Sequence, residues 1–140
     1  MRTVVDTNVL VSFLTDRHPE QQAQAAGLFS AAAAGENELL VPQLVVTELV
    51  FVLTNVYGRS NGEAASVVHD LLETPGAAIV DPLPWLVLFE LWPNRVPGFA
   101  DAVVAAVAAA GRTDAVATFD RPFARRLRRL GIPVHRFGNT

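Results

Sequence analysis

The sequence of 140 residues contains no cysteine and no lysine. Without cysteine, the chain cannot form a disulfide framework or a zinc site built on thiolates. All eleven basic residues are arginines, so any mechanism that depends on a lysine side chain is excluded as well. The absence of cysteine, together with an N-terminus that lacks an apolar signal core, predicts a cytoplasmic protein.

Long hydrophobic runs are also missing, although 51% of the residues are hydrophobic. The apolar stretch 44–53 is interrupted by Glu48, and the stretch 102–110 ends at Gly111. Neither reaches the ~20 apolar residues of a membrane-spanning helix, so no membrane association is expected. The length and the apolar content suit one folded domain over residues 1–140.

Hydrophobic periodicity predicts that strands alternate with helices along the whole chain. Strands are expected at residues 2–5, 39–41, 77–80, 115–119 and 133–137. Helices are expected at residues 7–14, 19–34, 42–57, 62–73, 85–91, 99–110 and 122–130, with Asn61 as the N-cap of the fourth. This alternation predicts an α/β fold with a mostly parallel central sheet of four to five strands, flanked by helices. In such folds the site lies outside the carboxyl ends of the strands.

Three aspartates occupy positions where a cap or a functional group is expected. Asp6 and Asp120 each follow a predicted strand and precede a predicted helix. Asp101 is the only charged residue between Arg95 and Arg112, and it lies in the first turn of a helix rich in alanine and valine. Each of the three also suits helix capping or a favourable interaction with the helix dipole.

Glu48 lies in the middle of a predicted helix, where capping does not explain it. Leu44, Val45, Phe51 and Val52 lie three or four residues away and surround it on the helix surface. A buried, unpaired carboxylate costs several kcal/mol, so this side chain needs a cation, a hydrogen-bond network or an open cleft. A structural salt bridge is the alternative.

The four carboxylates together suggest a metal site. Asp6 and Asp120 should converge, because parallel strands bring their carboxyl ends to one edge of a sheet. Four clustered carboxylates repel one another unless a cation neutralises them, and oxygen ligands suit Mg²⁺ or Mn²⁺. Zinc is disfavoured, since His18, His69 and His135 lie far apart in the sequence. We expect these histidines to be structural or surface residues.

Four segments resemble the successive motifs of PIN domains, in particular those of VapC-type toxin ribonucleases. They are residues 4–10 around Asp6, 42–53 around Glu48, 99–106 around Asp101 and 117–123 around Asp120. The resemblance covers nearly the whole chain and implies a PIN-like three-layer fold. It also implies that the four acidic residues are catalytic and hold Mg²⁺ or Mn²⁺. The activity implied is that of an endoribonuclease, the toxin component of a type II toxin–antitoxin system.

The same resemblance implies supporting residues, a mechanism and partners. Thr7, Asn8 and Thr118 would orient carboxylates, water or phosphate, although Asn8 also suits a helix cap and Thr118 an ordinary strand position. A metal-activated water would hydrolyse RNA, leaving 5′-phosphate and 3′-hydroxyl ends. The partners implied are a second copy of the chain and a VapB-like antitoxin that occludes the site. Any contact with DNA would come through the antitoxin, because the chain shows no helix-turn-helix signal.

Arginines crowd the last predicted helix, although the net charge of −3 argues against wholesale wrapping of nucleic acid. A charge run of this kind is usually a solvated helix face. Because the helix begins beside Asp120, some of these arginines are candidates for holding RNA phosphates. Arg125, Arg128 and Arg129 share one side of the helix and are the first candidates for RNA binding.

Two other classes of protein share features with this sequence. An aspartyl-phosphate enzyme also begins with an acidic residue at a strand end, but such proteins use a lysine near the phosphate, and this chain has none. A non-catalytic PIN-like module that binds RNA or protein is the remaining alternative. The presence of all four acidic positions argues against it.

Overall fold

The computed structural model describes residues 1–138, in which seven helices flank a four-stranded sheet. The elements follow in the order β1 (Arg2–Val5), α1 (Thr7–Leu14), α2 (Pro19–Ala33), β2 (Glu38–Pro42), α3 (Gln43–Asn55), α4 (Asn61–Leu72), β3 (Ala77–Val80), α5 (Trp85–Leu91), α6 (Phe99–Ala110), β4 (Ala115–Ala117) and α7 (Arg121–Arg129). Among these residues, no helix has the length and apolar character that crossing a membrane requires. The expected alternation of strands and helices is confirmed.

All four strands are parallel, and they lie in the order β3-β2-β1-β4. Parallel neighbours need a crossover connection, which is why helices separate the strands along the chain. Val4 in β1 pairs with Leu40 in β2 and with Val116 in β4. Thr3 to Asp6 are all buried, as expected for a central strand that is covered on both faces.

The fifth strand expected at residues 133–137 is not formed. Val134 makes a single parallel bridge to Val116 and then leaves the sheet. Pro133 has no N–H to donate to a ladder, and the ring of Phe137 stacks on Phe119 with centroids 4.4 Å apart. The segment is therefore held against β4 by one bridge and by ring packing.

The N-cap of α4 is Ser60, so the prediction of Asn61 was wrong. The Ser60 hydroxyl accepts a hydrogen bond from the N–H of Glu63 at 3.1 Å, and the Glu63 carboxylate accepts one from the N–H of Ser60 at 3.0 Å. This reciprocal capping box needs a glutamate three residues after the cap, and only Ser60 meets that condition.

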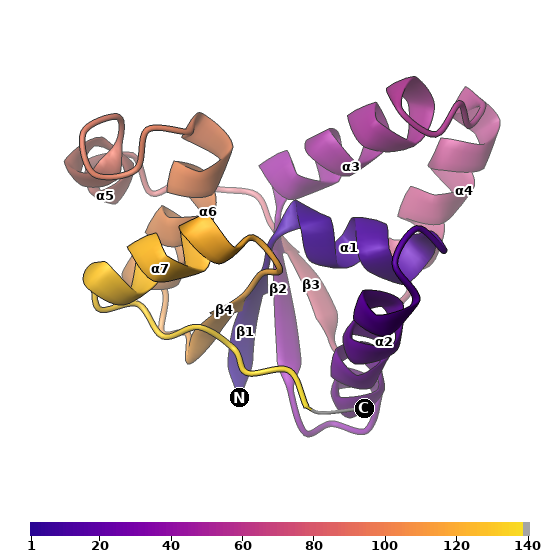
Figure 1. Ribbon diagram of the computed structural model, residues 1–140, viewed down its shortest axis with the longest axis horizontal. Coiled ribbons are helices and arrows are strands. Elements are labelled where there is room, and N and C mark those ends of the chain that lie inside the picture. The colour runs from indigo at the N-terminus through magenta and orange to yellow at the C-terminus, as the bar shows by residue number, and fades with distance from the viewer. Residues whose placement is uncertain (139–140) are drawn as a thin grey trace.

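Helix α6 forms the centre of the core. It packs against β1, β2 and β4, and every residue from Ala102 to Val107 is buried, together with Ala108. Small alanine and valine side chains let the helix approach the sheet closely. Since α6 leads back into β4, its N-terminus lies at the C-terminal end of the sheet, where α1, α3 and α7 also begin (Figure 1).

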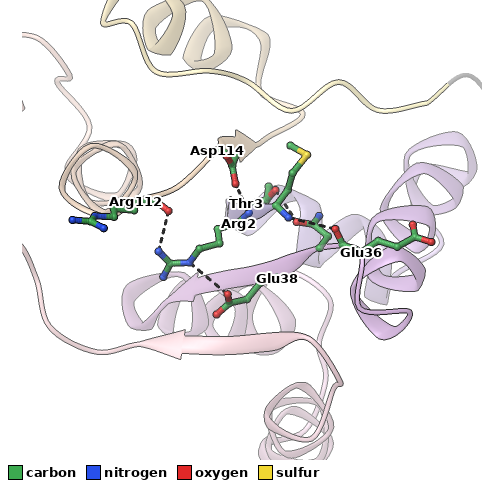
Figure 2. A network of polar contacts seen from close by, with 8 residues as sticks. Arg2, Thr3, Glu36, Glu38, Arg112 and Asp114 are labelled. Carbon is green, nitrogen blue, oxygen red and sulfur yellow. Dashed lines mark hydrogen bonds and ion pairs between the residues drawn. The ribbon is translucent and has the colours of Figure 1, made fainter.

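At the opposite end of the sheet, Arg2 contacts residues of β2 and of the turn before β4 (Figure 2). Its backbone N–H donates to Oδ2 of Asp114 at 2.6 Å, and its Nη1 donates to the carbonyl oxygen of Arg112 at 2.9 Å. Its Nε also lies 3.4 Å from Oε2 of Glu38. These contacts join the start of β1 to β2 and to the turn before β4. They leave the C-terminal end of the sheet open for other side chains.

Candidate functional site

A cleft of about 250 Å³ lies at the C-terminal end of the sheet and is lined by all four carboxylates singled out in the sequence. Asp6 follows β1, and Asp120 follows β4. Glu48 comes from α3, and Asp101 comes from the first turn of α6. Four elements that are far apart in the sequence therefore each contribute one carboxylate to the same cleft.

Asp6 is the most buried of the four, with 6% of its surface exposed, and its carboxylate accepts three hydrogen bonds. Oδ1 accepts from the N–H of Thr7 at 2.8 Å. Oδ2 accepts from the hydroxyl of Thr118 at 2.8 Å and from the side-chain amide of Asn8 at 3.0 Å. The orientation of this carboxylate is fixed from both sides, by its own helix and by the end of β4.

The side chains of Asn8 and Thr118 connect α1 to β4. The Asn8 amide donates to Oγ1 of Thr118 at 3.0 Å, and its Oδ1 accepts from the N–H of Phe119 at 2.8 Å. Oγ1 of Thr118 also accepts from the N–H of Asp120 at 3.1 Å. Asn8 therefore does not cap a helix, since Asp6 is the N-cap of α1. Thr118 is not an ordinary strand residue either, because β4 ends at Ala117 and the Thr118 hydroxyl joins Asp6, Asn8 and Asp120.

Glu48 is half-buried and is held by a hydrogen bond rather than by an ion pair. The hydroxyl of Thr7 donates to its Oε1 at 2.6 Å. Within residues 1–138, the ion pairs are Arg2–Glu38 and His69–Glu73, so the salt bridge considered for Glu48 is absent from this part of the chain. The open cleft explains how this carboxylate is tolerated on an apolar helix face.

Asp101 and Asp120 differ in how they are held. Oδ1 of Asp120 accepts from the N–H of Phe123 at 3.0 Å, which caps α7. Asp101 makes no capping bond in α6, whose N-cap is Gly98. The capping interpretation therefore holds for Asp6 and Asp120, whose carboxylates also line the cleft, and fails for Asp101.

Burial and mutual repulsion change the acidity of two of these groups. Desolvation raises the pKa of Asp6 to about 6, although hydrogen bonds from Thr118 and Thr7 oppose the rise and the charges of Asp101 and Glu48 add to it. Burial also raises the pKa of Asp101, and the charges of Asp120 and Glu48 add to that rise. The cleft therefore concentrates negative charge that a bound cation would relieve.

The donor set fits a hard divalent cation in its chemistry. All four acidic side chains offer oxygen, which Mg²⁺ and Mn²⁺ prefer, and no histidine lines the cleft. In the described part of the chain, however, no three acidic or histidine side chains already stand close enough together to hold an ion. The carboxylates share one cleft without forming a closed ligand cage.

Arg17 also lines this cleft, although no pattern in the sequence pointed to it. It lies in the turn between α1 and α2, between Asp16 and His18, and its side chain is exposed. A single arginine in a short polar turn carries no periodic or capping signal. Its position in the turn that follows α1, the helix capped by Asp6, was the only indication that it lies near the cleft.

Some of the arginines and histidines considered in the sequence line a second cavity, and their sequence spacing did not indicate which ones. Arg125 and Arg128 line a second cavity of about 510 Å³, whereas Arg129 is not among its lining residues. His18 and His135 line that same cavity, although the sequence suggested no association between them. Nδ1 of His18 also caps α2 by accepting from the N–H of Gln21 at 3.1 Å.

The fold and the cleft together define an α/β protein with an all-parallel sheet and an acidic site at the strand ends. The sequence profile of the PIN domain matches residues 3–127. The chain therefore belongs to the PIN domain family, and the resemblance seen in the four motifs is confirmed. No curated protein matches the sequence.

Solved structures of VapC toxins share this fold. VapBC2 from Rickettsia felis, bound to a DNA fragment from its promoter, superposes with a TM-score of 0.73 at 16% identity, covering 99% of this chain and 100% of that one. VapC20 from Mycobacterium tuberculosis, a toxin that cleaves the sarcin–ricin loop, gives 0.71 at 17% identity, covering 96% and 98%. VapBC-1 from nontypeable Haemophilus influenzae gives 0.68 at 15% identity, covering 96% and 97%.

Proposed function

We propose that this PIN domain is a metal-dependent endoribonuclease and the toxin component of a type II toxin–antitoxin system. The observation that carries the proposal is the meeting of Asp6, Glu48, Asp101 and Asp120 in one cleft at the strand ends. The raised pKa values of Asp6 and Asp101 support a site that is completed by a cation. The shared fold with VapC20, which cleaves RNA of the sarcin–ricin loop, favours RNA as the substrate.

In this proposal the four carboxylates would hold Mg²⁺ or Mn²⁺, and the ion would supply activation of water and stabilisation of charge on the phosphate. The neighbouring polar side chains orient two of these carboxylates. Thr118 and Asn8 hold Asp6 through its Oδ2, and Thr7 holds Glu48 through its Oε1. These hydrogen bonds restrain the carboxylates of Asp6 and Glu48, which limits the reorganisation needed for binding.

The proposed partners follow from the same comparisons. The Rickettsia felis and Haemophilus influenzae structures are VapBC assemblies, and this supports a VapB-like antitoxin for the chain. We propose that the antitoxin covers the acidic cleft and supplies any contact with promoter DNA, and that the toxin forms a homodimer in the cytoplasm. The net charge of −3 agrees with a toxin that does not bind DNA by itself.

A non-catalytic module that binds RNA or protein is the second candidate. One observation favours it, namely that no three acidic or histidine side chains within residues 1–138 are arranged closely enough to hold an ion. The two candidates differ in whether the cleft, once a metal is added, turns over a substrate.

The decisive experiment is RNA cleavage by the purified, antitoxin-free protein in Mg²⁺, in Mn²⁺ and in EDTA. Asp101→Asn tests the site, and Asp81→Asn, which changes an exposed aspartate outside the cleft, is the matched control. We expect metal-dependent cleavage that leaves 5′-phosphate ends, is lost in Asp101→Asn and persists in Asp81→Asn. Cleavage in EDTA or by Asp101→Asn contradicts the proposal. Metal binding without cleavage by the folded protein favours the non-catalytic module.

A further inference from the structure

We propose that the 510 Å³ cavity beside the carboxylate cleft binds the nucleotide next to the scissile phosphate of an RNA strand. Arginines of the cavity bind the phosphate of that nucleotide. This inference rests on the proposed function and names a second part of the substrate site. This arginine cavity is lined by Arg121, Arg125, Arg128, His18, His135 and Asp120, among others. Its volume lies within the range of small-molecule binding pockets.

The arginines of this cavity have no anionic partner within the described part of the chain. The ion pairs in residues 1–138 are Arg2–Glu38 and His69–Glu73. Glu20 and Asp120 also line the arginine cavity, but neither forms an ion pair with its three guanidinium groups. Guanidinium groups match phosphate oxygens in a bidentate geometry, so their convergence on a hollow favours a phosphate ligand.

The arginine cavity and the carboxylate cleft adjoin each other. Asp120 lines both of them. Arg17 lines the cleft and His18 lines the arginine cavity, although the two residues are neighbours in the turn between α1 and α2. A ligand that extends from one to the other therefore passes Asp120. An RNA strand has this character, because its phosphates follow one another along a continuous backbone.

The remaining lining suits the neutral parts of a nucleotide. His18, His135, Gln21 and Gln24 present polar groups to the arginine cavity. His135 is half-buried, and burial lowers its pKa, so that near neutral pH it offers hydrogen bonds rather than charge. The positive charge thus comes from the arginines of α7, and His135, Gln21 and Gln24 add polar groups to the same cavity.

The test is direct binding of a fluorescein-labelled, single-stranded RNA octamer in EDTA, followed by anisotropy. Arg125→Gln and Arg128→Gln are the test variants. Arg59→Gln is the matched control, since it removes the same charge from an exposed arginine between α3 and α4 that does not line the cavity. We expect each test variant to weaken binding about tenfold and to reduce the salt slope by about 1, and the control to change affinity less than twofold.

A second arm separates RNA from other anions. An acidic octapeptide with the same number of negative charges should bind the wild type more weakly than the RNA does and should not distinguish Arg125→Gln from Arg59→Gln. Equal losses in Arg125→Gln and Arg59→Gln overturn the inference. Peptide binding that matches RNA binding in strength and arginine dependence overturns it as well. Because metal is absent, the result is independent of cleavage, so failure of the nuclease proposal and failure of this inference are recorded separately.

Discussion

Replacing Asp6 by asparagine should stabilise the metal-free protein at neutral pH. The pKa of this buried carboxyl rises from 3.8 in a model peptide to about 6 in the folded chain. Its ionisation therefore opposes folding by about 3 kcal/mol above pH 6, a penalty that disappears as the pH falls below the unfolded pKa. Asparagine keeps the shape and removes the charge.

The gain will be smaller than the full penalty, because an amide has one acceptor where the carboxylate has two. Thr7 donates to one oxygen of Asp6, and Thr118 and Asn8 donate to the other. Losing one such bond costs on the order of 1 kcal/mol. We therefore expect a net stabilisation of roughly 1–2 kcal/mol at pH 7.5 without metal.

Urea unfolding in EDTA at pH 7.5 and at pH 4 measures this effect, with Asp81→Asn as the control for loss of an exposed carboxylate. The unfavourable contribution of Asp6 to the stability of the wild type should fade as the pH falls from 7.5 toward 4, so the advantage of Asp6→Asn should shrink over the same range. A variant that is less stable than the wild type at pH 7.5 would refute the reasoning, since it would mean that the ionised carboxylate stabilises the fold.

Two further substitutions distinguish residues needed for cleavage from residues needed only for stability. Thr118→Val removes the hydroxyl that joins Asp6, Asn8 and Asp120, and should cost about 1–3 kcal/mol in urea unfolding and lower RNA cleavage at least tenfold. Arg2→Gln, at the other end of the sheet, removes a half-exposed ion pair and an exposed hydrogen bond to the carbonyl oxygen of Arg112, and should cost about 1–2 kcal/mol with cleavage unchanged. A cleavage defect in Arg2→Gln as large as that of Thr118→Val would show that general destabilisation explains both.

The fold could be predicted because its signals are local. Strands and helices alternate in hydrophobic period, and Asp6 and Asp120 lie where a strand changes into a helix, so their convergence followed from the topology of a parallel sheet. The expected strand at 133–137 failed because its first residue is Pro133 and only Val134 bridges to β4. A run of apolar residues predicts burial but does not say which backbone groups remain free to pair.

The arginine cavity could not be predicted, because it depends on packing between distant segments. His18 lies in the turn before α2, Arg125 lies on α7, and His135 lies in the segment beyond it. No periodicity within one element indicates that these side chains share a hollow. The difference between Arg125 and Arg129 is equally invisible in the sequence, since both lie on the same side of one helix.

The pairing of β1 with β4 has a consequence for the protein during its own synthesis. Thr3 pairs with Ala115, so the strand that leads into Asp120 can dock on β1 only after the more than one hundred residues between them have been synthesised. Until then the chain lacks its fourth carboxylate and the Thr118 hydroxyl that orients Asp6. A product that terminates before β4 therefore cannot assemble the cleft. The order of translation thus delays formation of the complete site until β4 has been made.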